Sequence, residues 1–214
     1  NGTVGVVGGK AVHQRSPKER DEPVKLDTLT IDIGASSKAE AEKYVSPGDC
    51  AYYRSDYTEL GNGYLREKAL DDRIGCAIMV DILNKNLPYD VTCVFTVQEE
   101  IGTRGAKVAA YTVKPDYAIV LETTTACDFS GNDGELYRLG FEKAKEINVP
   151  CQTKTLVAGG NDSGAIHSSV GGIRTVALSV PCRYLHSPSC MIKKSDVQST
   201  AELAYAMYLA LAEK

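Results

Sequence analysis

Residues 71–121 read DDRIGCAIMVDILNKNLPYDVTCVFTVQEEIGTRGAKVAAYTVKPDYAIVL, and helical and extended patterns alternate along this stretch. Apolar residues recur at helical spacing over residues 71–86, which predicts a helix. Nearly continuous apolar runs predict buried strands over 90–97 and 117–121, with a small helix over 102–111 between them. Buried strands that alternate with helices are typical of an α/β domain in which helices flank a mixed sheet.

The alternation continues toward the C-terminus, whereas the beginning of the chain has a different pattern. A short strand is predicted over 155–157, a longer one over 174–180 and a long amphipathic helix over 195–213. Residues 1–64 contain short strands and turns instead, which predict a small β-rich domain. We therefore expect two domains, a small one over 1–64 and an α/β domain over 65–214.

The composition excludes several classes of protein. The chain of 214 residues is 43% hydrophobic and has a net charge of −4, which fits a globular core and offers no basic field for nucleic acid. No apolar run approaches the roughly 20 residues that cross a bilayer, and no signal peptide is visible at Asn1. The seven cysteines are odd in number and lie mostly in apolar runs, which predicts reduced thiols in a cytoplasmic protein.

Acidic side chains and one histidine lie at the ends of the predicted elements. Asp71 opens the first helix, and Glu99 and Glu100 follow the first strand. Glu122 follows the second strand, and His186 follows a later one. Sites in open α/β sheets form beyond the carboxyl ends of the strands. Taken singly, these residues fit a helix cap, a solvated pair or a structural histidine, but together they favour one site.

The chemistry of these side chains indicates a metal. Oxygen and imidazole ligands without a thiolate suit a catalytic zinc, cobalt or manganese ion. Adjacent glutamates allow one to bind the metal while the other takes a proton from the water that the metal activates.

Four ordered motifs carry a resemblance to a known family. The segments Leu70–Gly75, Val97–Ala106, Gly159–His167 and Arg183–Pro188 resemble the motif set of the M42 metallopeptidases. That family includes glutamyl aminopeptidases and tetrahedral, dodecameric aminopeptidases, some of them labelled endoglucanases. The similarity extends to Thr30–Lys38 and so runs over essentially the whole chain.

The resemblance implies two divalent metal ions, zinc or cobalt, in each subunit. Asp71 would bridge the two ions, and Glu100 and His186 would bind one of them. Glu122 would bind the other ion, although the family usually has aspartate at this position. Glu99 would be the general base.

The resemblance also assigns supporting residues and partners. Asp72 would support the first aspartate. Asp162 and His167 would lie near the substrate cleft, with a structural role left open for both. The expected substrates are peptides, and the expected assembly is a dimer built through the small domain, able to associate further to a dodecamer.

Two departures from the family pattern concern the extent of the chain. The family has a further histidine ligand upstream of the small domain, but the histidines here are His13, His167 and His186, and none lies in that context. The family also has additional residues near 134 and 135. We therefore expect that the N-terminal part of the catalytic domain and an internal segment near 134/135 are missing from this chain.

The function expected from these residues is that of a dinuclear metallo-aminopeptidase, a hydrolase that removes N-terminal residues from peptides. A glycoside hydrolase of endoglucanase type is the alternative, because paired carboxylates also cleave sugars. The absence of tryptophan disfavours it, since sugar clefts commonly use aromatic platforms. A non-catalytic oligomerisation fragment is the third hypothesis.

Overall fold

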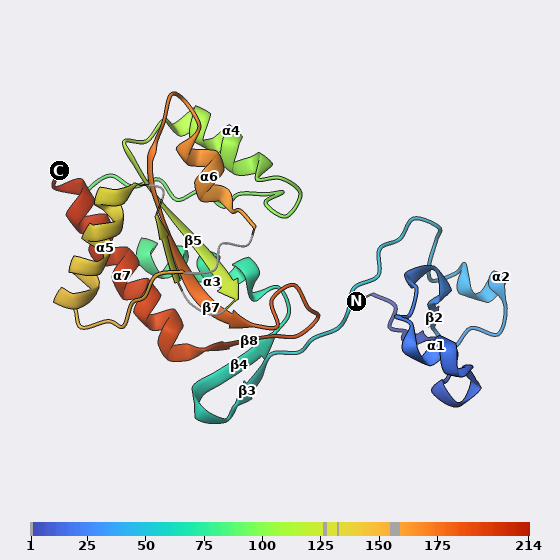
Figure 1. Cartoon of the computed structure of the whole chain (residues 1–214). Coiled ribbons are helices and arrows are strands. Elements are labelled where there is room, and N and C mark those ends of the chain that lie inside the picture. Colours follow the sequence, from blue (N-terminus) through green and yellow to red (C-terminus); the bar gives the residue numbers. More distant parts are fainter. Residues whose placement is uncertain (1, 126–127, 132, 155–158) are drawn as a thin grey trace. The chain divides into compact units, whose positions relative to one another are not determined.

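The structure is a computed structural model that describes residues 2–125, 128–131, 133–154 and 159–214 (Figure 1). The chain divides into two compact units, Asn1–Tyr52 and Tyr53–Lys214. The boundary between these units precedes the predicted one at residue 64, because Thr58–Leu60 already pairs with a strand of the larger unit. The strand predicted over 155–157 lies outside the described residues.

The smaller unit is built from short elements. Strands β1 (Val6–Gly8) and β2 (Thr30–Asp32) pair in antiparallel fashion. Around them lie the short helices α1 (Pro17–Asp21) and α2 (Lys38–Ala41) and the 3₁₀ turns Val12–Gln14 and Leu26–Thr28. No side chain among the described residues of this unit is fully buried. Its apolar side chains therefore remain largely in contact with solvent.

The larger unit contains a mixed β-sheet. The strand order is β3-β4-β8-β7-β5, and β6 pairs with β7. Among the described strands of this sheet, only β5 and β7 pair in parallel, and the other pairs are antiparallel. The strands are β3 (Thr58–Leu60), β4 (Tyr64–Glu67), β5 (Tyr117–Thr125), β6 (Asp128–Gly131), β7 (Arg174–Arg183) and β8 (Cys190–Lys193), with a 3₁₀ turn at Gly61–Gly63.

Helices flank this sheet in two groups (Figure 1). One group comprises α3 (Leu70–Leu83), α5 (Gly134–Glu146) and α7 (Lys194–Ala212), which share a buried core with β7. In the other group, α6 (Asp162–His167) contacts β5 and β7, and α4 (Arg104–Val113) packs on α6. The predicted fold class, a mixed sheet flanked by helices, is therefore confirmed.

Helical periodicity explains why α3 and α7 form and which faces they bury. The buried residues of α3 recur every three to five positions, at Leu70, Gly75, Ile78 and Ile82. In α7 the buried positions fall in the C-terminal half, where Met207 is fully buried in the same core. Neither these helices nor the others in the described part of the chain are long and apolar enough to cross a membrane.

The strand predicted over 90–97 is not a strand in the structure. Residues 90–98 have no regular secondary structure, and Phe95 is 48% exposed. The reason is that no strand among the described residues pairs with this segment, so its apolar sequence has no ladder to join. Its beginning is held by Tyr208, whose hydroxyl accepts from the Tyr89 N–H and donates to the Tyr89 carbonyl.

Candidate metal centre

Asp71 and Asp72 lie at the start of α3, where the backbone is not yet helical. The Asp71 side chain is 17% exposed. The Asp72 carboxylate turns back to accept a hydrogen bond from the Gly75 N–H at 3.0 Å. An added Cβ at position 75 would lie 2.1 Å from Asp72 Oδ2, so the carboxylate would have to leave this position. Local packing thus fixes the Asp72 side chain and the backbone that carries Asp71.

Glu99 and Glu100 lie on a tight turn between the irregular segment 90–98 and α4. The Glu99 carbonyl accepts from the N–H groups of Gly102 and Thr103 at 3.0 and 2.9 Å. The Gly105 N–H donates to the Val97 carbonyl at 3.0 Å. These hydrogen bonds tie the two glutamates to the N-terminus of α4.

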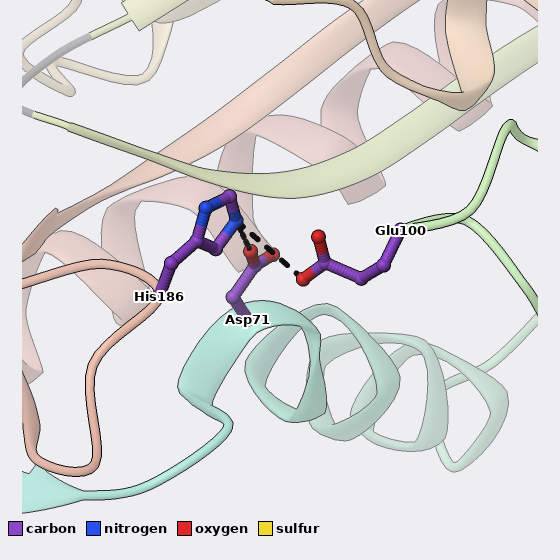
Figure 2. A group of neighbouring side chains, drawn as sticks. All are labelled: Asp71, Glu100 and His186. Carbon is purple, nitrogen blue, oxygen red and sulfur yellow. Dashed lines mark hydrogen bonds and ion pairs between the residues drawn. The ribbon is translucent and has the colours of Figure 1, made fainter. Parts of the chain in front are cut away.

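His186 lies on the loop that joins β7 to β8. Its Nε2 is 3.1 Å from Asp71 Oδ2 and 3.4 Å from Glu100 Oε1. Figure 2 shows the three side chains pointing toward one another from three separate segments. One ligand atom from each lies within 4.8 Å of the others. The structure therefore brings together three of the four predicted ligands.

Glu122, the fourth predicted ligand, lies inside a strand rather than after one. β5 continues to Thr125 because β7 supplies partners as far as Cys182. Glu122 is buried, and among the described residues it is not part of the group formed by Asp71, Glu100 and His186. It does line the same cavity of about 1380 Å³ as Asp71 and Glu100.

Further acidic side chains, partly or fully buried, line the cavity to which Asp71 and Glu100 contribute. Burial raises the pKa of Glu122 to about 9, and the Asp72 carboxylate adds to this effect. Burial also raises the pKa of Asp72 to about 8, against the hydrogen bond from Gly75. For Glu99, burial and then the charge of Asp162 raise the pKa above its usual range. Crowded carboxyl groups of this kind are stabilised in their charged forms when a cation lies between them.

The two residues predicted near the substrate have partners within the chain. Asp162 is 5% exposed, and its Oδ2 accepts from the Thr96 hydroxyl at 2.6 Å. The Nδ1 atom of His167 lies 3.0 Å from the Ile173 carbonyl oxygen. Thr96 was not expected at the site, because nothing in the local sequence distinguishes it from Thr92.

The donor set fits a divalent metal ion. Carboxylate oxygens and an imidazole nitrogen are ligands of zinc and of cobalt. The positions also suit a cation, because Asp71 and Glu100 converge with a histidine beside carboxyl groups whose pKa is raised by burial. Fold and site together define an α/β domain with a candidate carboxylate–histidine metal centre.

This chain belongs to the M42 glutamyl aminopeptidase family, whose sequence model matches residues 1–141 and 133–203. The resemblance inferred from the four motifs is thus confirmed. The lysyl aminopeptidase of Pyrococcus furiosus is 30% identical over 227 residues, a match that covers 95% of this chain and 66% of that protein.

Solved structures of the same family have a similar fold. The TET aminopeptidase from a marine sediment Thaumarchaeota archaeon has a TM-score of 0.85 at 29% identity, covering 94% of this chain and 66% of that one. The TET1 peptidase of Pyrococcus horikoshii, which can assemble into a tetrahedron or a large octahedral shell, has a TM-score of 0.78 at 29% identity, with coverages of 97% and 67%. The chain spans about two thirds of the length of these relatives.

Proposed function

We propose that the protein is a metal-dependent aminopeptidase that hydrolyses N-terminal residues from peptides. The observation that carries this proposal is the convergence of Asp71, Glu100 and His186 at one point. The chain also belongs to an aminopeptidase family, so we assign peptide hydrolysis to a metal ion held at this point. Because the chain spans only part of its relatives, the proposal concerns the full-length protein.

In this proposal the site holds two divalent ions, zinc or cobalt. Asp71 would be the ligand shared by the two ions, Glu100 and His186 would hold one of them, and Glu122 would hold the other. When bound, such ions polarise the scissile carbonyl and lower the pKa of water toward neutrality. Asp72 keeps the start of α3 in place through its hydrogen bond to Gly75, and so supports Asp71.

Glu99 acts as the general base in this proposal. Its carboxyl group lines the cavity beside Asp71 and Glu100, and its raised pKa brings it closer to the pH at which it would work. Glu99 takes a proton from the attacking water and then delivers it to the leaving amine. A carboxylate suits both steps, because it can accept a proton and return it.

In this proposal Asp162 and His167 lie near the substrate cleft, and Asp162 lines the same cavity as Asp71 and Glu100. The carboxylate of Asp162 is buried against Thr96, and the ring of His167 is engaged by the Ile173 carbonyl. These contacts give both side chains partners within the chain, so a structural role is the alternative for each.

We also propose that the protein self-associates in the cytoplasm. The small unit exposes large apolar side chains, including Val6, Leu26 and Ile31, which favours an interface there. We propose a dimer through this unit that can build a dodecamer; a dodecamer is stated for the PhTET1 structure, and a tetrahedron for the peptidase from Pyrococcus horikoshii. The thiols of Cys50, Cys76, Cys93, Cys182 and Cys190 are free, as in a reducing compartment. Light scattering that finds a monomer at micromolar concentration would contradict the assembly.

Chelation followed by metal restoration tests the proposed activity. The full-length protein should release chromophore from an aminoacyl anilide, lose this activity with a chelator and regain it with zinc or cobalt. The N-acetylated anilide is the matched control, because an aminopeptidase requires a free amine. Activity on a cellulose oligomer that survives chelation would instead support the glycoside hydrolase, and no activity on either would support the non-catalytic alternative.

A further inference from the structure

Asp162 has a buried carboxylate, and only one of its two oxygens has a hydrogen-bond partner among the described residues. Its Oδ2 accepts from the Thr96 hydroxyl at 2.6 Å. Its Oδ1 is also buried and has no hydrogen-bond partner among the described residues. Burying a carboxylate in this way disfavours folding, so stability alone does not account for it.

Thr96 lies near the end of an irregular segment, just before the turn that carries Glu99 and Glu100. It precedes Glu99 by three residues, on a segment whose backbone makes no hydrogen bonds from Asp90 to Thr96 within the described residues. From Val97 onward the backbone is tied to the start of α4. The Thr96 hydroxyl therefore makes the last side-chain hydrogen bond that fixes the segment before the two glutamates.

We infer that Asp162 is a positioning residue for the Glu99–Glu100 pair and acts through Thr96. The hydrogen bond anchors the segment that leads into the pair to the N-terminus of α6, which packs against both β5 and β7. Asp162 thus belongs to a helix that is packed on the sheet, not to a loop. The inference rests on the proposed function in so far as Glu99 and Glu100 have the roles given above.

Two further observations support this role. Asp162 and Thr96 line the same cavity as Glu99 and Glu100. The hydroxyl-to-carboxylate distance is typical of a strong, charge-assisted hydrogen bond, which fixes geometry better than a neutral one. A misplacement of about 1 Å at a catalytic group can reduce the rate by about 100-fold. Holding the backbone before Glu99 in one position would therefore protect the rate of the reaction.

Substitutions of Thr96 in the full-length protein test the inference. Thr96→Val removes the hydroxyl at nearly constant volume, and we expect kcat to fall between about 10- and 100-fold while KM and metal content change little. Thr96→Ser keeps the hydroxyl and should restore most of kcat. Thr112→Val is the matched control, because that hydroxyl bonds only to the Val108 carbonyl within α4.

The Asp162→Asn substitution provides a second test of the inference. An amide can still accept from Thr96 but without charge, so its loss of kcat should be smaller than that of Thr96→Val. In the double variant, Asp162→Asn should add little to the effect of Thr96→Val, since both act through one contact. Additive losses would overturn the inference.

Hydrogen–deuterium exchange provides a readout that does not need activity. The turn that carries the glutamates accepts hydrogen bonds from the N–H groups of Gly102, Thr103 and Gly105. These N–H groups should exchange faster in Thr96→Val, and their exchange rates should not change in Thr112→Val. Unchanged exchange and full kcat in Thr96→Val would overturn the inference. If the unsubstituted protein lacks peptidase activity, the proposed function fails, and the exchange data still decide whether Asp162 positions this turn.

Discussion

His186 Nε2 lies 3.1 Å from Asp71 Oδ2, although 115 residues separate the two in the sequence. The sheet explains this proximity. β4, which leads into Asp71, pairs with β8, which follows His186, and Glu67 lies opposite Cys190. The antiparallel pair thus brings the end of one strand and the beginning of the other to the same edge.

The Glu99→Gln substitution tests the proposed general base. An amide has nearly the shape of the carboxylate, but it can neither accept nor return the proton. Peptidase turnover in the full-length protein should fall by at least about 100-fold, while bound metal, measured by elemental analysis, should stay nearly constant. A variant with full turnover would show that the mechanism is wrong.

Substitutions at Glu100 and His186 should instead weaken metal binding, because each removes a ligand. We expect Glu100→Gln and His186→Ala to raise the Kd for zinc by at least about 10-fold, as measured by competition with a chromogenic chelator. His13→Ala is the matched control, since His13 lies in the small unit. If Glu99→Gln loses metal and Glu100→Gln retains it, the two assignments are reversed.

Gly105→Ala should disturb the turn that carries the two glutamates. An added Cβ would lie 2.4 Å from the Val97 carbonyl oxygen, so one of the two backbones must move. We expect a loss of about 1–3 kcal/mol in the free energy of unfolding, measured with urea, together with lower turnover. Gly164→Ala on α6 is the control, because nothing lies within 4 Å of its added Cβ. Equal stability of the two variants would contradict the predicted clash.

Asp133 should stabilise the fold in a pH-dependent way. It caps α5 through the N–H groups of Glu135 and Leu136 and pairs with Arg174, and the Arg174 hydrogen bond holds its pKa below the usual range. Asp133→Ala should cost about 1–2 kcal/mol at neutral pH.

The sign of this pH dependence follows from the lowered pKa. A carboxyl group with a lowered pKa stabilises the fold above its unfolded pKa of about 3.9, and this contribution is lost as the pH falls toward the folded value. The difference in melting temperature between Asp133→Ala and the unsubstituted protein should therefore shrink below about pH 4. Asp56→Ala, which removes an exposed ion pair with Arg54, should cost much less at any pH.

Local patterns in the sequence were enough to predict that Asp71, Glu100 and His186 lie close together, because each lies just outside an apolar run that forms or leads into the core. The position of Glu122 within β5 was not predictable in this way. Three threonines follow it, and a polar run of that kind becomes a strand only because β7 lies alongside. Pairing between distant strands leaves no local signal.

The segment 90–97 illustrates the opposite error. Its apolar sequence is typical of a strand, but a strand also needs a hydrogen-bonding partner, and the described residues provide none. The contact between Thr96 and Asp162 joins positions 66 residues apart. Neither residue type nor spacing could have indicated it.

Anomalous X-ray diffraction at the zinc edge, from crystals of the full-length protein grown with zinc, tests the central claim most directly. We predict an anomalous peak roughly 2.0–2.2 Å from His186 Nε2 and from carboxylate oxygens of Asp71 and Glu100. Zinc peaks elsewhere in the molecule, with none between these three side chains, would contradict the proposed metal centre.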